Sequence, residues 1–93
     1  MDEVTLWRKF FQHWPAKLPQ RGLIVTRFDE QFPFNGFLIA GDMLMLERKT
    51  PDNLGARKML LPISQIAAIK IIDPIKGEIF KESGFQGQLP EGA

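Results

Sequence analysis

The chain of 93 residues has no cysteine and no tyrosine, and it has only one histidine and two serines. Without cysteine it forms neither a disulfide nor a thiolate metal site, and one imidazole does not make a zinc site. We therefore expect no metal and no other cofactor. Nucleophilic catalysis needs a nucleophile oriented by a base and a third group, and the only imidazole, His13, lies in an aromatic helical segment rather than at a strand end. The composition predicts a protein that is not an enzyme and has no catalytic residues.

Neither sign of charge is in clear excess, because 12 Lys and Arg balance 11 Asp and Glu and leave a net charge of +1. Proteins that neutralise many phosphates are more strongly basic. No apolar run reaches the roughly 18 residues of a membrane span, and the acidic start Met1-Asp2-Glu3 differs from a secretory signal. These features predict a soluble, cytoplasmic protein that does not bind membranes.

The first segment carries four aromatic residues at spacings of three and four. They are Trp7, Phe10, Phe11 and Trp14. This spacing predicts a helix over residues 3–14 with one aromatic stripe. Pro15 ends the pattern, because it disfavours helical geometry in the preceding residue. The stripe is either a ligand platform or a packing face against a barrel or a neighbouring subunit, and packing is the simpler interpretation.

Short β-branched and apolar segments follow, separated by turn residues. The expected strands are 23–28, 34–40, 43–49, 56–61 and 66–72. Residues 29–33 are expected to form a turn, since Pro33 cannot serve a central ladder, and Gly36 indicates a bend inside the second strand. Closely spaced strands without intervening helices predict a mainly β fold, a small bent five-stranded antiparallel barrel after an N-terminal helix. We assign residues 1–76 to this domain and 77–93 to a flexible, glycine-rich extension.

Two dibasic steps, Arg48-Lys49 and Arg57-Lys58, flank the turn-rich segment 50–55. If the neighbouring strands form a hairpin, these cations face each other, and like charges across strands repel. The cluster is then either a solvated loop neutralised by Glu47 and Asp52 or a contact surface for an anionic partner such as RNA.

The chain resembles the Sm and Sm-like RNA-binding proteins, whose bent five-stranded barrel also follows a helix. The positions that fit the spacing of the family's first motif are Gly36, Leu38, Asp42 and Met45. Those that fit the apolar frame of the second motif are Leu61, Ile66 and Ile69. Leu46 stands where the family has Asn, and Pro62 and Ile63 replace its Arg and Gly. Other small barrels of the SH3-like and PRC types share the Leu-Pro-x-x-x-Ile step, so the subfamily stays open.

The resemblance implies an RNA-binding module, although Leu46 and Pro62 cannot make the base-reading hydrogen bonds of the family's Asn and Arg. Weak RNA binding without strong sequence preference is therefore expected. The candidate RNA-binding residues are Asp42, Met45, Arg48, Lys49, Arg57 and Lys58.

The family also assembles into rings by pairing edge strands of neighbouring subunits, which implies a homo-oligomer here. Segments 59–61 and 66–72 are apolar on both faces, more so than a solvent-facing edge. The candidate interface residues are Met59, Leu60, Leu61, Ile66, Ile69 and Ile71. Two alternatives stay open: both faces are covered within one chain, or the domain is a structural or protein-interaction barrel without a nucleic-acid role.

Overall fold

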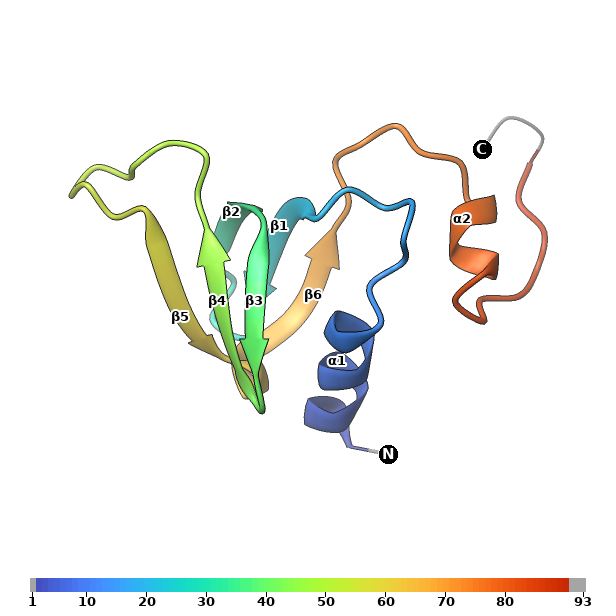
Figure 1. The fold of residues 1–93 in the computed structure, drawn as a ribbon, viewed down its shortest axis with the longest axis horizontal. Helices are drawn as coiled ribbons and strands as arrows, with labels where there is room; N and C mark the ends of the chain where they lie inside the picture. The colour runs from blue at the N-terminus through green and yellow to red at the C-terminus, as the bar shows by residue number, and fades with distance from the viewer. Residues whose placement is uncertain (1, 91–93) are drawn as a thin grey trace.

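The computed structural model describes residues 2–90 and shows a mainly β fold with an N-terminal helix (Figure 1). In this range six strands form two three-stranded antiparallel sheets, with orders β2-β1-β6 and β3-β4-β5. The elements are α1 (Glu3–Gln12), β1 (Arg21–Thr26), β2 (Gln31–Asn35), β3 (Phe37–Ala40), β4 (Met43–Glu47), β5 (Lys58–Pro62), the 3-10 turn η1 (Ile63–Gln65), β6 (Ile66–Lys70) and α2 (Glu78–Lys81). Neither of the two helices within residues 2–90 is long and apolar enough to cross a membrane.

Helix α1 begins and ends where local chemistry favours it. The Asp2 carboxylate accepts a hydrogen bond from the backbone N–H of Thr5 at 2.7 Å, which caps the helix start. The helix ends at Gln12, two residues earlier than expected, because Pro15 restricts Trp14 to extended geometry. The Trp14 indole N–H instead donates to the Leu18 carbonyl at 2.9 Å. The helix was therefore predicted correctly apart from its last two residues.

The aromatic stripe of α1 packs on the strands of the same chain. The Phe11 ring is buried and lies 5.0 Å, centroid to centroid, from the ring of Phe37. Trp14 contacts both Phe37 and Phe34 edge-on or at a tilt, arrangements that aromatic rings favour. The stripe therefore serves as a packing face, and the interpretation as a ligand platform is not needed to explain it.

The expected second strand is two strands, because Gly36 breaks it. Gly36 has φ +113°, a backbone conformation that residues with a Cβ rarely adopt. Before it, β2 pairs with β1; after it, β3 pairs with β4. Chain direction changes at this point, and the two halves enter different sheets. Residues 2–90 thus form six strands in two three-stranded sheets, and a closed five-stranded barrel is not shown.

The expected turn at 29–33 is wrong in its second half, since Gln31 to Pro33 belong to β2. Pro33 lies opposite Leu23 of β1. Its missing N–H is tolerated because β2 is an edge strand of its sheet, where one side needs no partner. The other strand limits differ less: β4 stops at Glu47 and β5 starts at Lys58, leaving 48–57 as a loop.

The core lies between the two sheets and α1. Its fully buried members are Ile24, Leu44, Leu46, Ile63 and Ile66. Each comes from a different element or from alternate positions of one strand, as the two-residue period of a strand requires. The inner face of β4 therefore carries Leu44 and Leu46, and its outer face carries Met43 and Met45.

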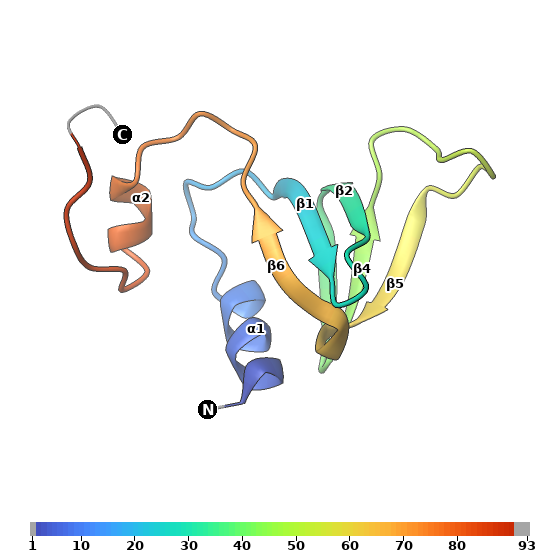
Figure 2. The same cartoon turned by 180° about the vertical axis from the view of Figure 1, so that it is seen from behind.

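The loop 48–57 and the C-terminal segment lie at opposite ends of the molecule, as both views show (Figures 1 and 2). Residues 77–90 contain α2, a short helix that sequence analysis did not predict. The Phe80 and Phe85 rings pack edge to face at 5.8 Å, and Lys17 forms an ion pair with Glu82 at 3.5 Å. The last three residues of the expected extension, 91–93, lie outside the described residues.

Candidate functional site

The expected basic hairpin is present, and it brings the two dibasic steps together. Glu47 and Lys58 are opposite each other in the β4–β5 register. One step further, the backbone N–H of Arg48 donates to the Arg57 carbonyl at 2.8 Å. Arg48, Lys49, Arg57 and Lys58 therefore gather at one end of the sheet, where the chain leaves β4 and enters β5.

Asp52 organises the loop that joins these steps. Its carboxylate accepts hydrogen bonds from the backbone N–H groups of Leu54 and Ala56 at 2.8 and 2.9 Å. The bonds from Ala56 and Leu54 hold the pKa of Asp52 below its ordinary value of 3.8. Asp52 thus holds the backbone of the loop in place, and its charge also interacts with that of Arg48.

Only one of the four cations at this end has a carboxylate partner in the part of the chain that the structure describes. Lys58 lies 3.2 Å from the Glu47 carboxylate, and the Arg48 Nε donates to the Thr50 carbonyl at 3.0 Å. Lys49 and Arg57 are exposed. The loop therefore presents unneutralised positive charge to solvent.

Asp42 lies at the opposite end of β4, far along the strand from the basic loop. It follows Gly41, whose φ of +58° makes the tight turn between β3 and β4. The Asp42 carboxylate pairs with the Arg8 guanidinium at 2.5 Å, and its carbonyl accepts from the Ile63 N–H at 2.8 Å. Asp42 therefore ties α1 and η1 to this turn.

The six residues that sequence analysis grouped as RNA-binding do not form one site. Four lie at the basic loop, Asp42 lies at the other end of the sheet, and the Met45 side chain points outward from the middle of β4. Leu46, at the position of the family's base-reading Asn, is 1% exposed and belongs to the core. Asp42 and the basic loop are separated by the length of β4, so the candidates do not share one pocket within a single chain.

A broad apolar face covers the outside of the β3-β4-β5 sheet. The register places Leu38, Met45 and Leu60 in one row across three strands. The next row is Ala40, Met43 and Pro62. Leu38 and Leu60 are 66% and 69% exposed, so no element within residues 2–90 covers this surface. We call these six residues the outer face.

The expected interface residues divide between core and surface. Leu61 and Ile66 are buried in the core because strand alternation turns their side chains inward, so these side chains are not presented to a second chain. Leu60 is exposed, and Met59, Ile69 and Ile71 are half-buried. Both strands lie at sheet edges, β5 beside β4 only and β6 beside β1 only.

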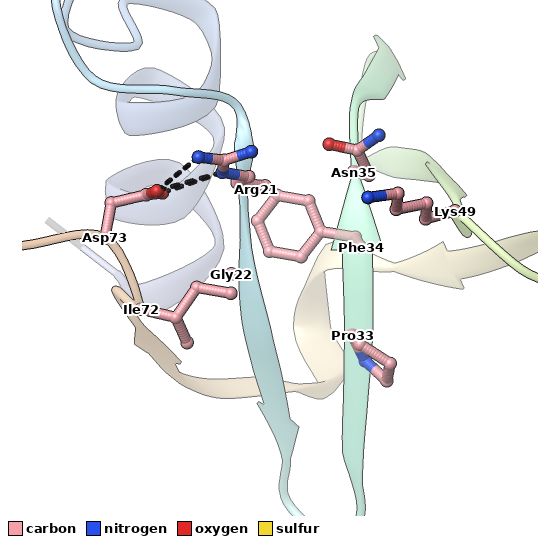
Figure 3. A pocket seen from close by; sticks show the side chains of 8 residues that line it. All are labelled: Arg21, Gly22, Pro33, Phe34, Asn35, Lys49, Ile72 and Asp73. Carbon is pink, nitrogen blue, oxygen red and sulfur yellow. Dashed lines mark hydrogen bonds and ion pairs between the residues drawn. The ribbon is translucent and has the colours of Figure 1, made fainter.

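A pocket of about 400 Å³ lies between the start of β1, the end of β2 and the segment after β6 (Figure 3). Arg21 lies on one side, Asn35 and Lys49 on the other, and Phe34 between them. Asp73 accepts hydrogen bonds from Arg21 Nε at 3.0 Å to each oxygen and from Nη2 at 2.5 Å. This fork raises the pKa of Arg21 and lowers that of Asp73, so the pair stays charged.

Sequence analysis missed this pocket. Arg21 and Asp73 are 52 residues apart, and neither belongs to a recognisable motif. The only local signal is Gly22, where an added Cβ would lie 2.5 Å from the Lys70 carbonyl oxygen. A glycine inside a strand indicates such a close approach, but it does not say which residues gather above it.

No family model matches the chain, and searches of the curated proteins and of the solved structures give no match.

Proposed function

We propose that the chain is a non-catalytic, Sm-like binding module that assembles with copies of itself through the outer face and the neighbouring edge of β5. The observation that supports assembly best is the outer face itself. Large contiguous apolar surfaces are rare on monomers and mark interaction sites. Removing the Leu38, Met43 and Leu60 side chains from water would contribute about 25 cal/mol for each Å² of apolar surface buried.

The free edges support the same proposal. β5 borders the outer face and leaves one side without a strand partner, as does β6 in the other sheet. An unpaired edge is a template for a strand of another chain. Pairing β5 of one copy with β6 of the next would satisfy both edges at once and extend the sheet across subunits. Such head-to-tail contacts close into a ring only where the rotation closes.

Charge favours a copy of the same chain over a nucleic acid on this face. At one end of the outer face Asp42 pairs with Arg8, and at the other Glu47 pairs with Lys58. The rim thus carries both signs, already paired. A nucleic acid would favour a rim of one positive sign, whereas a protein surface with an apolar centre and a mixed polar rim fits an apolar interface.

Light scattering tests the assembly across a hundredfold range of concentration that includes the micromolar range. We expect a mass above the 10.6 kDa of one chain, and a lower mass for the substitutions Leu38→Lys and Leu60→Lys. Leu54→Lys is the matched control, because Leu54 is 96% exposed on the distant loop. Circular dichroism checks that each variant folds. A constant mass of 10.6 kDa for the unsubstituted chain would refute self-assembly and leave another protein as the partner of this face.

A second candidate function, weak RNA binding, rests on the basic loop alone. Arg48 and Arg57 face each other, and Lys49 and Arg57 project into solvent. Cations of this kind contact phosphates and position a backbone, but they do not read bases. The core position of Leu46 leaves no base-reading side chain at the position where the family has one.

A titration with single-stranded RNA at two salt concentrations tests this candidate. Binding should weaken steeply with salt and vary little with RNA sequence. Replacing Arg57 and Lys58 with Ala should lower affinity equally for all sequences and reduce the salt slope by about 1–2. Lys81→Ala, in α2 at the far end, should leave both unchanged. Tight, sequence-selective binding that survives the double substitution would show that the basic loop is not the RNA contact.

A further inference from the structure

Arg21 lines this pocket, and its guanidinium has hydrogen-bonding capacity that the described residues leave unused. Asp73 engages two of the three guanidinium nitrogens of Arg21. Figure 3 shows the third nitrogen pointing away from Asp73, toward the side of the pocket where Asn35 and Lys49 lie. Within residues 2–90 that nitrogen, Nη1, has no protein acceptor. Two N–H donors are therefore directed into the pocket in a fixed orientation.

Ligand binding would require little further ordering of the Arg21 side chain. Its fork is held by an Asp73 side chain that is only 11% exposed, so the guanidinium is already positioned before a ligand arrives. Preorganised donors lose less conformational entropy when they bind an anion. Lys49 faces the guanidinium from the loop after β4 and supplies a second, flexible ammonium group.

The charges that line the pocket match a single negative charge. Arg21 and Lys49 bring two positive charges and Asp73 one negative charge, which leaves a net +1. An incoming oxyanion would face Arg21 Nη1 and Lys49 Nζ, with Asp73 on the far side of the guanidinium. A neutral ligand gains nothing from these two donors beyond ordinary hydrogen bonds.

The rest of the pocket is apolar and larger than an anionic group alone requires. Ile72 is 58% exposed on the β6 side of β1, Pro33 is exposed across β1 on β2, and the Phe34 ring lies between β1 and β2. Gly22 lets β1 approach β6 closely beside the pocket, because a Cβ there would lie 2.5 Å from the Lys70 carbonyl oxygen. The volume of about 400 Å³ lies in the range of small-ligand sites, about 300–1,000 Å³.

We infer that this pocket binds a small organic oxyanion, a carboxylate or phosphate ester with a compact apolar body. Its oxygens accept hydrogen bonds from Arg21 and Lys49, and its apolar body lies along Ile72 and Pro33. The pocket uses neither the outer face nor the β5 edge, but Ile72 and Asp73 directly follow β6, the other edge in the proposed assembly. Ligand binding and assembly are therefore measured at the same protein concentration. Lys49 belongs both to the pocket and to the basic loop.

Nuclear magnetic resonance titrations with benzoate, phenyl phosphate and inorganic phosphate test this inference, with phenol as a neutral compound that has the same aromatic ring. Benzoate and phenyl phosphate should give saturable shifts at the Ile72 methyl groups and the Asn35 amide, and phenol should bind at least about tenfold more weakly. Inorganic phosphate should bind more weakly than phenyl phosphate, because it leaves Ile72 and Pro33 uncovered.

Two single substitutions separate the pocket from general positive charge. Lys49→Ala should weaken benzoate binding about fivefold or more, as expected for one charge-assisted hydrogen bond. Arg57→Ala removes a cation from the same loop without lining the pocket, so it should leave the affinity unchanged. Arg21→Lys keeps the charge but loses the fork, and it should also weaken binding.

Three results would overturn the inference. Benzoate binding no better than phenol would show that the two cations do not act on a ligand here. Equal losses for Lys49→Ala and Arg57→Ala would show diffuse electrostatic attraction. Shifts at Ile72 with a short oligouridine but with neither small oxyanion would assign the pocket to an RNA strand instead.

Discussion

Replacing Leu46 with Asn distinguishes two placements of that side chain. By its resemblance to the Sm family, position 46 would carry a surface residue that reaches an RNA base. In the structure it lies in the middle of the core, opposite Met59 and 1% exposed. Asn and Leu have similar branched shapes, so the substitution changes polarity far more than volume.

The expected cost follows from burial. Replacing Leu46 removes the stabilisation that a fully buried Leu side chain gives the protein, about 1.5–3 kcal/mol. The Asn amide gains no partner among the apolar residues around it, which adds about 1–3 kcal/mol for an unsatisfied polar group. The total of about 2.5–6 kcal/mol compares with about 5–14 kcal/mol for the stability of a domain of this size. Leu46→Asn should therefore leave the protein marginally folded.

Urea unfolding followed by the fluorescence of Trp7 and Trp14 measures this cost, since both rings pack against the core. With an m value of about 1–1.5 kcal/mol/M, the midpoint should fall by at least about 1.7 M. All variants are compared at one protein concentration, because assembly makes stability concentration-dependent. Leu54→Asn, the same change at a 96% exposed position, should alter stability by no more than about 0.5 kcal/mol. If Leu46→Asn costs less than about 1 kcal/mol, the inward placement of Leu46 is wrong.

Two further predictions concern the bend and the loop. Gly36→Ala should destabilise the protein by about 1–3 kcal/mol through backbone strain at φ +113°. A steric clash does not contribute, because the nearest atom to an added Cβ is 3.9 Å away. An unchanged urea midpoint would contradict this prediction. The folded pKa of Asp52 lies below 3.8, so its contribution to loop order is complete above that value and is lost as pH falls through the folded pKa. Amide exchange at Leu54 and Ala56 should therefore accelerate only in acid, beyond the intrinsic pH dependence of exchange, and Asp52→Ala should accelerate it at neutral pH as well.

Local features of the fold could be predicted from the sequence because their causes are local. The aromatic spacing and Pro15 are enough to place α1, and the turn residues at 50–55 are enough to place the basic hairpin. Gly36 was predicted as a bend, but nothing nearby shows that its two sides enter different sheets. Pro33 was misjudged for a related reason: a proline is excluded from central strands only, and edge or centre is a property of the whole sheet.

The face of each strand that points inward was decided by tertiary structure. In Met43 to Leu46 every residue is apolar, so the two-residue alternation that usually separates core from surface is invisible. The same holds for Leu60 and Leu61, of which one is exposed and the other buried. Packing against Phe11 and the opposite sheet selects Leu44 and Leu46 for the core, which leaves the methionines outside.

By itself, the sequence determined the chemistry available to this protein: no thiols, one imidazole, and four cations around one loop. Only tertiary structure decided which of these groups meet. Arg21 and Asp73 are 52 residues apart and meet because β1 and β6 are neighbours in one sheet. Lys49 and Asn35 join them from two other segments of the chain. Contacts between such distant residues follow from strand order and bending, which depend on how the whole core packs and which no local pattern of residues records.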